Sequence, residues 1–419
     1  MGDEAKVAVA GVGMTAFGKF LDRGLKSLST EAVDAALADA GLAPEDIQVA
    51  FAGNSVAGLI TGQECIRGQV VLRESSIGGI PIFNVENACA SSSSAFHLAW
   101  QMVAAGAYDT ALVVGFEKLT HADKKTSLSA FSSAVDVELA VALQEMMQKM
   151  GSKPDKSANG DGDGEAKPKG GGGGKSMFMD IYAAAIRIHM NQYGTTQEQI
   201  AKVCVKSHHN GALNPRAQYR EEFTLDEVLG AREIAYPLTL PMCAPIGDGA
   251  AAALLVSDSY AKSKGISGPR IAASIVRSGS LPSAGTEMAE VRAANAAYEM
   301  AGLGPDDVDV AEVHDATSAA EILAYEDLGF CPRGEGGRLA DEGATAIGGR
   351  IPVNTSGGLS SKGHPIGASG VAQLCEITWQ LRGEGGPRQV EGARIGLTQN
   401  GGGFLGNDAA AQAVHILTA

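Results

Sequence analysis

The chain has 419 residues, of which 48 are acidic and 33 basic, so its formal net charge at pH 7 is −15. This charge would repel nucleic acid and anionic membrane surfaces, so neither is an expected partner. Residues 1–4 lack the basic-then-apolar order of a secretion signal, and no uncharged apolar run of ~18 residues appears, which excludes a predicted membrane span. The composition therefore predicts a cytoplasmic protein.

Strands and helices alternate along the first part of the chain. Hydrophobic periodicity predicts strands over residues 6–13, 47–52, 81–86 and 110–115. It predicts helices over residues 27–41, 63–74 and 89–106, the first of them ended by Gly41. This βα alternation is typical of sheets covered by helices.

The alternation breaks between residue 117 and about residue 245. Within this region, residues 151–175 contain nine glycines and no aliphatic side chain larger than alanine. Such a segment cannot bury apolar surface, so we expect a mobile surface loop. Five consecutive glycines at 170–174 lack the spacing to lysine and serine or threonine that a phosphate-binding loop needs, which favours a linker.

The last part of the chain repeats the order of the first. Strands are predicted near residues 270–276, 308–313, 351–353 and 393–398. Helices are predicted near residues 287–302, 317–328 and 366–382. A chain of this length exceeds one hydrophobic core, and the repeat predicts two similar halves around an insertion.

Cys89 lies where the extended residues 81–88 enter a helical pattern of small residues. At the first turn of a helix, free N–H groups and the macrodipole would stabilise a thiolate near neutral pH. The alternative is a small buried apolar residue, which is what a free cysteine usually is. The small neighbours leave room for an acyl group, so Cys89 is a candidate nucleophile.

Two histidines occupy loops of the kind that carry catalytic groups. His314 follows the predicted strand 308–313, and His364 lies in the glycine-rich residues 353–370, just before a helix. Each histidine alone would more often be a structural group. Together with Cys89, they predict a catalytic set.

At these positions the chain resembles the thiolase superfamily, from about Val7 to the C-terminus. The segment around Cys89 is similar to the nucleophile motif of that family, and Gly363-His364-Pro365 to its second active-site loop, with Asn354 matching the asparagine before it. Residues 115–120 and 247–252 resemble two further family motifs.

Two further segments resemble one branch of the family, the sterol carrier protein-type thiolases. They are His314-Asp315-Ala316 and residues 214–220. Ordinary thiolases carry asparagine where His314 stands.

The resemblance implies an α/β chain with the five-layered αβαβα thiolase fold, in which two similar halves pack their central helices together. The N-terminal half would span residues 1–116, with its final strand region at 246–268, and the C-terminal half residues 269–419. Residues 117–245 would form a loop domain that covers the active site, with the flexible insertion 151–175 inside it.

The resemblance also implies acyl transfer with coenzyme A as substrate and no bound cofactor. Cys89 would attack the 3-keto carbon of a 3-oxoacyl-CoA, with His364 as its base. His314 and His364 would stabilise the enolate oxygen, and the N–H groups of Cys89 and of Gly401 or Gly402 would bind the thioester oxygen. Asn354 and Asn400 would support this site.

One residue of the common thiolase pattern is missing. The second cysteine, which moves a proton, is replaced by Gln399 or Asn400. Neither side chain exchanges a proton as a thiol does. Relatives of the branch can carry a cysteine in the His314 loop, but Ala316 stands there. The acid/base that would take its role stays unassigned.

The partners implied by the resemblance are a second copy of the chain and a small accessory subunit with a zinc ribbon and an OB-fold. The six cysteines of this chain show neither the paired spacing of a zinc site nor a disulfide framework, so any zinc would belong to that subunit and the cysteines are expected to be reduced. Substrates of the branch include aromatic and branched 3-oxoacyl-CoA esters such as benzoylsuccinyl-CoA. Basic residues of the middle region that could bind coenzyme A, rather than form a solvated face, are Lys124, Lys125, Lys202, Lys206, Arg216 and Arg220.

Three other functions are alternatives, and they differ in whether they need Cys89, His314 and His364. A decarboxylating or biosynthetic condensing enzyme also employs one cysteine with two histidines. A retro-aldolase of the same branch does not need the Cys89 nucleophile. An inert thiolase-like scaffold subunit would tolerate the Gln399-Asn400 replacement but would not need Cys89, His314 and His364.

Overall fold

The computed structural model describes residues 6–138, 177–280, 287–406 and 408–419. The predicted flexible insertion, residues 151–175, lies outside the described residues. In the first half, five strands lie side by side in the order β3 (Ile82–Val85), β2 (Val49–Gly53), β4 (Thr110–Glu117), β7 (Gly249–Ser257) and β1 (Val7–Met14). β2 runs parallel to β3 and β4, and β7 antiparallel to β4 and β1. Every residue of β1, β2, β4 and β7 is buried, as their continuous apolar runs predict.

The second half repeats this arrangement. Its strands lie in the order β9 (Val310–Glu312), β10 (Ile395–Leu405), β11 (Asp408–Thr418) and β8 (Arg270–Ser278). β10 is parallel to β9 and antiparallel to β11, which is antiparallel to β8. The two sets of strands meet through one residue pair, Ala8 of β1 with Arg270 of β8. The prediction of two similar halves is confirmed.

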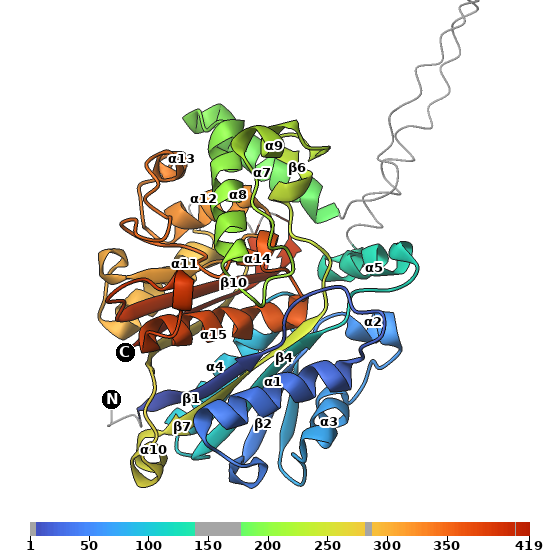
Figure 1. Cartoon of the computed structure of the whole chain (residues 1–419), viewed down its shortest axis with the longest axis vertical. Coiled ribbons are helices and arrows are strands. Elements are labelled where there is room, and N and C mark those ends of the chain that lie inside the picture. Colours follow the sequence, from blue (N-terminus) through green and yellow to red (C-terminus); the bar gives the residue numbers. More distant parts are fainter. Residues whose placement is uncertain (1–5, 139–176, 281–286, 407) are drawn as a thin grey trace, which may run out of the picture.

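Helices complete the five layers (Figure 1). α1 (Leu25–Ala40) and α3 (Arg67–Leu72) pack on the outer face of the first sheet, while α11 (Ala289–Ala301) and α12 (Ser318–Asp327) lie on the other side of the molecule. α4 (Ser91–Ala104) and α15 (Ser369–Arg382) lie between the halves and contact each other. All of α15 except Arg382 is buried, and its buried polar side chains find partners, such as Glu376 with Arg388.

The central helices approach each other closely because their contact residues are small. A Cβ atom on Gly370 of α15 would lie 2.8 Å from the backbone nitrogen of Ser93 in α4. On the sheet side, a Cβ on Gly53 or Gly115 would lie 2.6 Å from atoms of Ser92. The run of serines after Cys89 therefore serves helix packing as well as access to the site.

The inserted region lies over the second half of the fold. It contains α5 (Lys124–Ala130), α7 (Met177–Tyr193), α8 (Gln197–Ala212), α9 (Leu225–Gly230) and the short strands β5 (Glu233–Ala235) and β6 (Leu238–Thr239). α8 packs against α12, α13 (Gly336–Asp341) and α14 (Gly358–Ser361), and Figure 1 shows α7, α8 and α9 at the top of the molecule. The remaining helices are α2 (Ala57–Thr61) and α10 (Asp258–Lys264).

Several predicted boundaries are wrong for identifiable reasons. The expected strand 351–353 is reduced to one bridge between Val353 and Ala311, because Pro352 has no N–H for a ladder. The expected helix 63–74 is the shorter α3 followed by a turn of 3-10 helix at Arg73–Ser75. The expected helix 89–106 begins at Ser91, so Cys89 lies two residues before it.

The strand predicted at 393–398 continues to Leu405, and β11 was not predicted. Among the described residues, no helix is both long enough and apolar enough to cross a membrane.

A buried ion pair joins the glycine-rich loop to β9. Lys362 Nζ lies 3.1 Å from Glu312 Oε2, and both side chains are 1% exposed. Glu312 also accepts a hydrogen bond from the Ser356 backbone N–H at 2.9 Å and one from the Ser356 hydroxyl. This pair fixes the loop that carries His364 to the strand that leads to His314.

Removing one partner of this pair should destabilise the fold. Lys362→Met leaves the Glu312 charge buried without a cation, so the free energy of unfolding should fall by ~3–5 kcal/mol. Lys26→Met breaks the exposed pair of Lys26 with Glu74 and should cost at most about 1 kcal/mol. Urea denaturation of both variants measures the difference. The double variant Lys362→Met/Glu312→Gln should recover part of the loss, and equal stability of Lys362→Met and the parent would contradict this role.

Candidate active site

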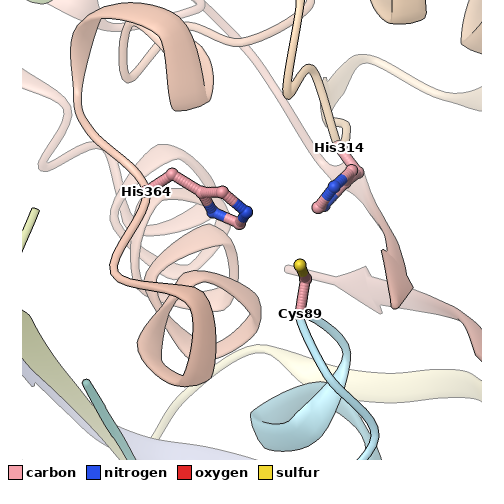
Figure 2. Close-up of side chains that lie close together, drawn as sticks. All are labelled: Cys89, His314 and His364. Atoms are coloured by element: carbon pink, nitrogen blue, oxygen red, sulfur yellow. The ribbon is translucent and has the colours of Figure 1, made fainter. Parts of the chain in front are cut away.

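The structure brings the three predicted catalytic residues together. Figure 2 shows Cys89, His314 and His364 pointing toward one another from the turn before α4, the loop after β9 and the loop before α15. The cysteine sulfur and one nitrogen of each ring all lie within 4.8 Å of one another. The two rings are 5.1 Å apart between centroids and nearly perpendicular, at 79°.

Cys89 is presented by a tight turn between β3 and α4. The preceding residue, Ala88, has a φ of 48°, in the left-handed region that an alanine rarely adopts. The Ala90 N–H donates to the Asn87 carbonyl at 2.9 Å, which closes the turn around Cys89. Local strain of this kind is characteristic of positions where function fixes the side chain.

The expectation of a preformed thiolate is wrong. Burial, together with the nearby Glu117 charge, raises the pKa of the Cys89 thiol to about 12, although the N–H groups of Cys89 and Gly403 act in the opposite direction. The cysteine lies before the helix rather than in its first turn, and it is partly buried at the wall of a cavity. The thiol is therefore protonated in the free protein and needs a base.

His364 has the form that a base requires. Its Nδ1 lies 2.8 Å from the Ser369 hydroxyl, which in turn lies 3.0 Å from the Pro365 carbonyl. A carbonyl only accepts, so the hydroxyl donates to Pro365 and accepts from Nδ1–H of His364. Burial lowers the pKa of His364 well below its usual range, so the ring is neutral. Its Nε2 consequently carries a lone pair.

His314 has the opposite form. Its Nδ1 lies 3.2 Å from the amide nitrogen of Asn400, which can only donate, so this Nδ1 accepts and Nε2 carries the hydrogen. Burial lowers the pKa of His314 to about 4, so this ring is also neutral. One imidazole at the sulfur is thus an acceptor and the other is a donor.

Asn354 supports the strand end instead of facing the sulfur. Its side-chain oxygen accepts from the Val313 N–H at 2.8 Å, and its amide donates to Glu321 at 2.8 Å. The residue is fully buried with a φ of 55°. It fixes the backbone immediately before His314.

The two residues at the place of the missing cysteine both hold the His314 loop. Gln399 accepts from the His314 backbone N–H at 2.7 Å and donates to Glu290 at 2.6 Å, while Asn400 contacts the His314 ring. Glu290 is half-buried at the start of α11, and desolvation together with the charge of Asp327 raises its pKa well above the usual range. The sequence carried no signal for Glu290, because its partner lies more than a hundred residues away.

The glycine loop of β10 packs directly on the nucleophile turn. A Cβ on Gly402 would lie 2.1 Å from the Asn87 carbonyl oxygen, so only glycine fits there. Gly401 and Gly403 line the cavity above the sulfur, and it is the Gly403 N–H that hydrogen-bonds the sulfur. The N–H groups of Cys89 and Gly403 therefore both act on the sulfur.

A cavity of about 1430 Å³ opens above the three residues. Its walls are largely apolar and include Phe131, Phe178, Ile181, Phe223, Leu240 and Phe404. Three cationic side chains, Lys19, Lys124 and Arg232, also line it. The cavity has room for a coenzyme A thioester and cations for an anionic group.

Most of the predicted basic patch is engaged elsewhere. Lys202 pairs with Asp341 at 2.8 Å, and Lys206 pairs with the buried Glu321. The Arg216 guanidinium stacks 4.4 Å from the centroid of the Trp379 ring. Of the six residues proposed from sequence, Lys124 lines the cavity, whereas Lys19 and Arg232 were missed.

Comparisons with known proteins agree with this geometry. The chain matches the family models "Thiolase, N-terminal domain" over residues 7–159 and "Thiolase C-terminal domain-like" over residues 277–418. It is 40% identical to the "Acetyl-CoA acetyltransferase" of Methanothermobacter thermautotrophicus, covering 98% of this chain and 99% of that one. It is 36% identical to "Sterol carrier protein 2" of Bos taurus, covering 94% and 70%.

Two further similarities concern proteins that work in complexes. The "Benzoylsuccinyl-CoA thiolase subunit BbsB" of Thauera aromatica is 35% identical, covering 96% of this chain and 95% of that one. Among solved structures, "Ltp2-ChsH2(DUF35) aldolase" superposes with a TM-score of 0.74 at 25% identity, covering 99% and 98%. The chain therefore belongs to the thiolase superfamily, in its sterol carrier protein-type branch, and is an enzyme of the acyltransferase class.

Proposed function

We propose that this enzyme transfers an acyl group between carbon and the sulfur of coenzyme A through an acyl thioester on Cys89. The observation that carries the proposal is the contrast between two rings at one sulfur: His364 Nδ1 lies 2.8 Å from the Ser369 hydroxyl, and His314 Nδ1 lies 3.2 Å from the Asn400 amide nitrogen, which favours opposite tautomers. His364 Nε2 can accept the thiol proton, and His314 Nε2–H can donate to an oxygen that becomes negative.

The reaction begins when His364 takes the proton from Cys89. The thiolate attacks the 3-keto carbon of a 3-oxoacyl-CoA, and the bond between the 2- and 3-carbons breaks with its electron pair left on the enolate. The His314 N–H donates to the enolate oxygen. His364 returns its proton to the 2-carbon, which releases an acyl-CoA.

Coenzyme A completes the cycle. His364 takes the proton of its thiol, the new thiolate attacks the thioester carbonyl, and Cys89 leaves as thiolate and recovers the proton. The N–H groups of Cys89 and of the loop 401–403 would bind the carbonyl oxygen. In this scheme one histidine moves every proton, so no second cysteine is required at Gln399 or Asn400. The reverse sequence is a condensation.

The cavity supports a bulky acyl group. Its aromatic and aliphatic walls would accommodate an aromatic or branched chain of the kind named in the BbsB relative, benzoylsuccinyl-CoA. Coenzyme A would enter as substrate, with its phosphates near the cations that line the opening.

A retro-aldolase is the second candidate, because the aldolase structure is among those that resemble this chain over nearly its whole length. That reaction needs no cysteine nucleophile, whereas Cys89 lies at the centre of this site. A thioester adduct on Cys89 distinguishes the two.

The assembly we propose is a homodimer with a small zinc-ribbon and OB-fold subunit, in the cytoplasm. Two observations favour an accessory subunit: BbsB is a thiolase subunit by its name, and the aldolase structure names a DUF35 partner. The net charge of −15 opposes polyanionic coenzyme A, so a partner would assist its binding.

Cys89→Ser should abolish the protein-bound thioester and acyl transfer, because serine has no sulfur to form a thioester and its hydroxyl gives up a proton far less readily than a thiol. Mass spectrometry after incubation with 3-oxoacyl-CoA should find the acyl group on Cys89 in the parent protein. Cys65→Ser, which alters an exposed cysteine, is the control and should change nothing. An acyl group mapped to any other residue would refute the mechanism.

Variants of the two histidines should differ in how they change the alkylation rate of the Cys89 thiol. His314→Ala and His364→Ala should each lower turnover by roughly 10²–10³, the cost of losing one oxyanion donor or base. His364→Ala should also slow alkylation of Cys89 by iodoacetamide, while His314→Ala should not, since its N–H cannot accept a proton. Because the thiol pKa lies near 12, the alkylation rate of the parent protein should still rise with pH above 9. Exposed His209→Ala is the control, and full turnover of either active-site variant would contradict the assignment.

Lys124→Glu should raise KM for coenzyme A roughly tenfold, the equivalent of one charge-assisted hydrogen bond of ~1.5 kcal/mol, with kcat unchanged. Lys125→Glu makes the same charge change at the next position of α5, outside the cavity lining, and should leave KM within about twofold of the parent. Steady-state kinetics at low salt compares the two. An equal rise of KM in both variants would show that only the overall charge of the protein affects coenzyme A binding.

A further inference from the structure

We propose that Cys89, His314 and His364 also form a three-ligand site for a zinc-type divalent cation, which reversibly blocks the nucleophile when no acyl-CoA is bound. Their ligand atoms, one sulfur and two imidazole nitrogens, lie within 4.8 Å of one another (Figure 2). The sequence could not suggest this site, because the three ligands come from distant segments with no metal-binding spacing.

The donor set and its spacing suit zinc. Zn–S bonds of ~2.3 Å and Zn–N bonds of ~2.0–2.1 Å place tetrahedral ligand atoms roughly 3.3–3.6 Å apart. Small side-chain rotations would bring the atoms from their present spacing to these values. Sulfur and imidazole favour zinc over magnesium or calcium, which prefer oxygen. Three protein ligands leave the fourth position facing the cavity, open to water.

His364 is already oriented as a metal ligand. Its Nδ1–H donates to Ser369 at 2.8 Å, and Ser369 donates to Pro365, so Nε2 offers its lone pair to the site. Metal-binding histidines normally have such a second hydrogen bond, which fixes the tautomer.

His314 needs its hydrogen moved to Nδ1, and Asn400 can stabilise that form. The side-chain oxygen of Asn400 is buried and has no hydrogen-bond partner among the residues that the structure describes. A half-turn of the amide would place this oxygen against Nδ1–H of His314, where it accepts. The Asn400 amide thus supports two forms of His314. With the amide nitrogen facing Nδ1, the hydrogen of His314 is on Nε2, which can donate in catalysis. With the amide oxygen facing Nδ1, the hydrogen is on Nδ1 and Nε2 can bind a metal.

The surrounding charge favours a cation at this point. The carboxyl groups of Glu117 and Glu86 act on the Cys89 sulfur, and their ionised forms oppose a negative charge there, although burial raises the pKa of Glu117 to about 7. The same field stabilises a positive one. Binding replaces the thiol hydrogen by the metal: one S–H bond breaks, one S–metal bond forms, and one proton leaves to solvent. The ion then occupies the space of the substrate carbonyl, so ion and acyl-CoA exclude each other.

The test uses the full chain after dialysis against EDTA. Calorimetry with ZnCl₂ should give one equivalent per chain, and Co²⁺ should give the intense near-ultraviolet absorption of a thiolate–cobalt bond. Cys89→Ser, His314→Ala and His364→Ala should each weaken binding at least tenfold, whereas Cys65→Ser should not. Bound Zn²⁺ should also protect Cys89 from iodoacetamide, and EDTA should restore both alkylation and activity.

Two variants outside the ligand set separate this site from unspecific metal binding. Asn400→Asp gives His314 a permanent acceptor and should tighten Zn²⁺ binding about ten- to hundredfold. Ser369→Ala removes the acceptor of His364 and should weaken binding by a similar factor. Circular dichroism checks that each variant is folded. Undiminished binding in Cys89→Ser, weaker binding in Asn400→Asp, or no saturable binding at micromolar Zn²⁺ would overturn the proposal.

Discussion

The ion pair between Lys362 and Glu312 is the constraint on which the geometry of the site depends. It joins the end of β9, two residues before His314, to the loop that continues to His364, so it holds together the two segments that carry the rings. In a dry interior such a pair is strong when its geometry is satisfied, and here the Ser356 backbone and hydroxyl complete the coordination of the carboxylate. A second buried carboxylate, Glu117, lies where the first half of the fold meets the His364 loop. It accepts from backbone N–H groups of Val56 at 3.3 Å and Gly367 at 3.1 Å, which connects the first half of the fold to the His364 loop.

The site between these carboxylates is itself uncharged. Burial raises the pKa of the cysteine and lowers the pKa of both histidines, so all three groups are neutral before substrate arrives. The hydrogen bonds of Ser369 and Asn400 then determine which ring nitrogen carries a hydrogen. Two chemically identical side chains acquire opposite roles through their outer neighbours alone. The same neutrality keeps the thiol unreactive toward solvent reagents.

The sequence was sufficient for the order of the elements and for the three central residues, because each rests on a local pattern. The buried strands β1 and β4 are continuous apolar runs, and His314 and His364 follow directly from strand ends and glycine loops. β11 was missed because its first part, Asp-Ala-Ala-Ala-Gln, has no strand-like alternation of large residues. Contacts between distant positions could not be predicted from local patterns. Examples are the hydrogen bond of Gln399 with Glu290 and the position of Lys19 and Arg232 at one cavity. Cys89 lies before the helix rather than in its first turn because of a turn at Ala88 that no propensity indicates.

The contact between Gly370 and Ser93 has a consequence for how the enzyme is made on the ribosome. Helix α4 packs on β2, β4 and β7 of its own half, but the face that contacts α15 stays uncovered until α15 has been synthesised. The nucleophile is among the first parts of the site to be made, and its base and the glycine loop of β10 are among the last. Acyl transfer therefore cannot begin on a partly synthesised chain. The uncovered face of α4 is buried only when the second half docks.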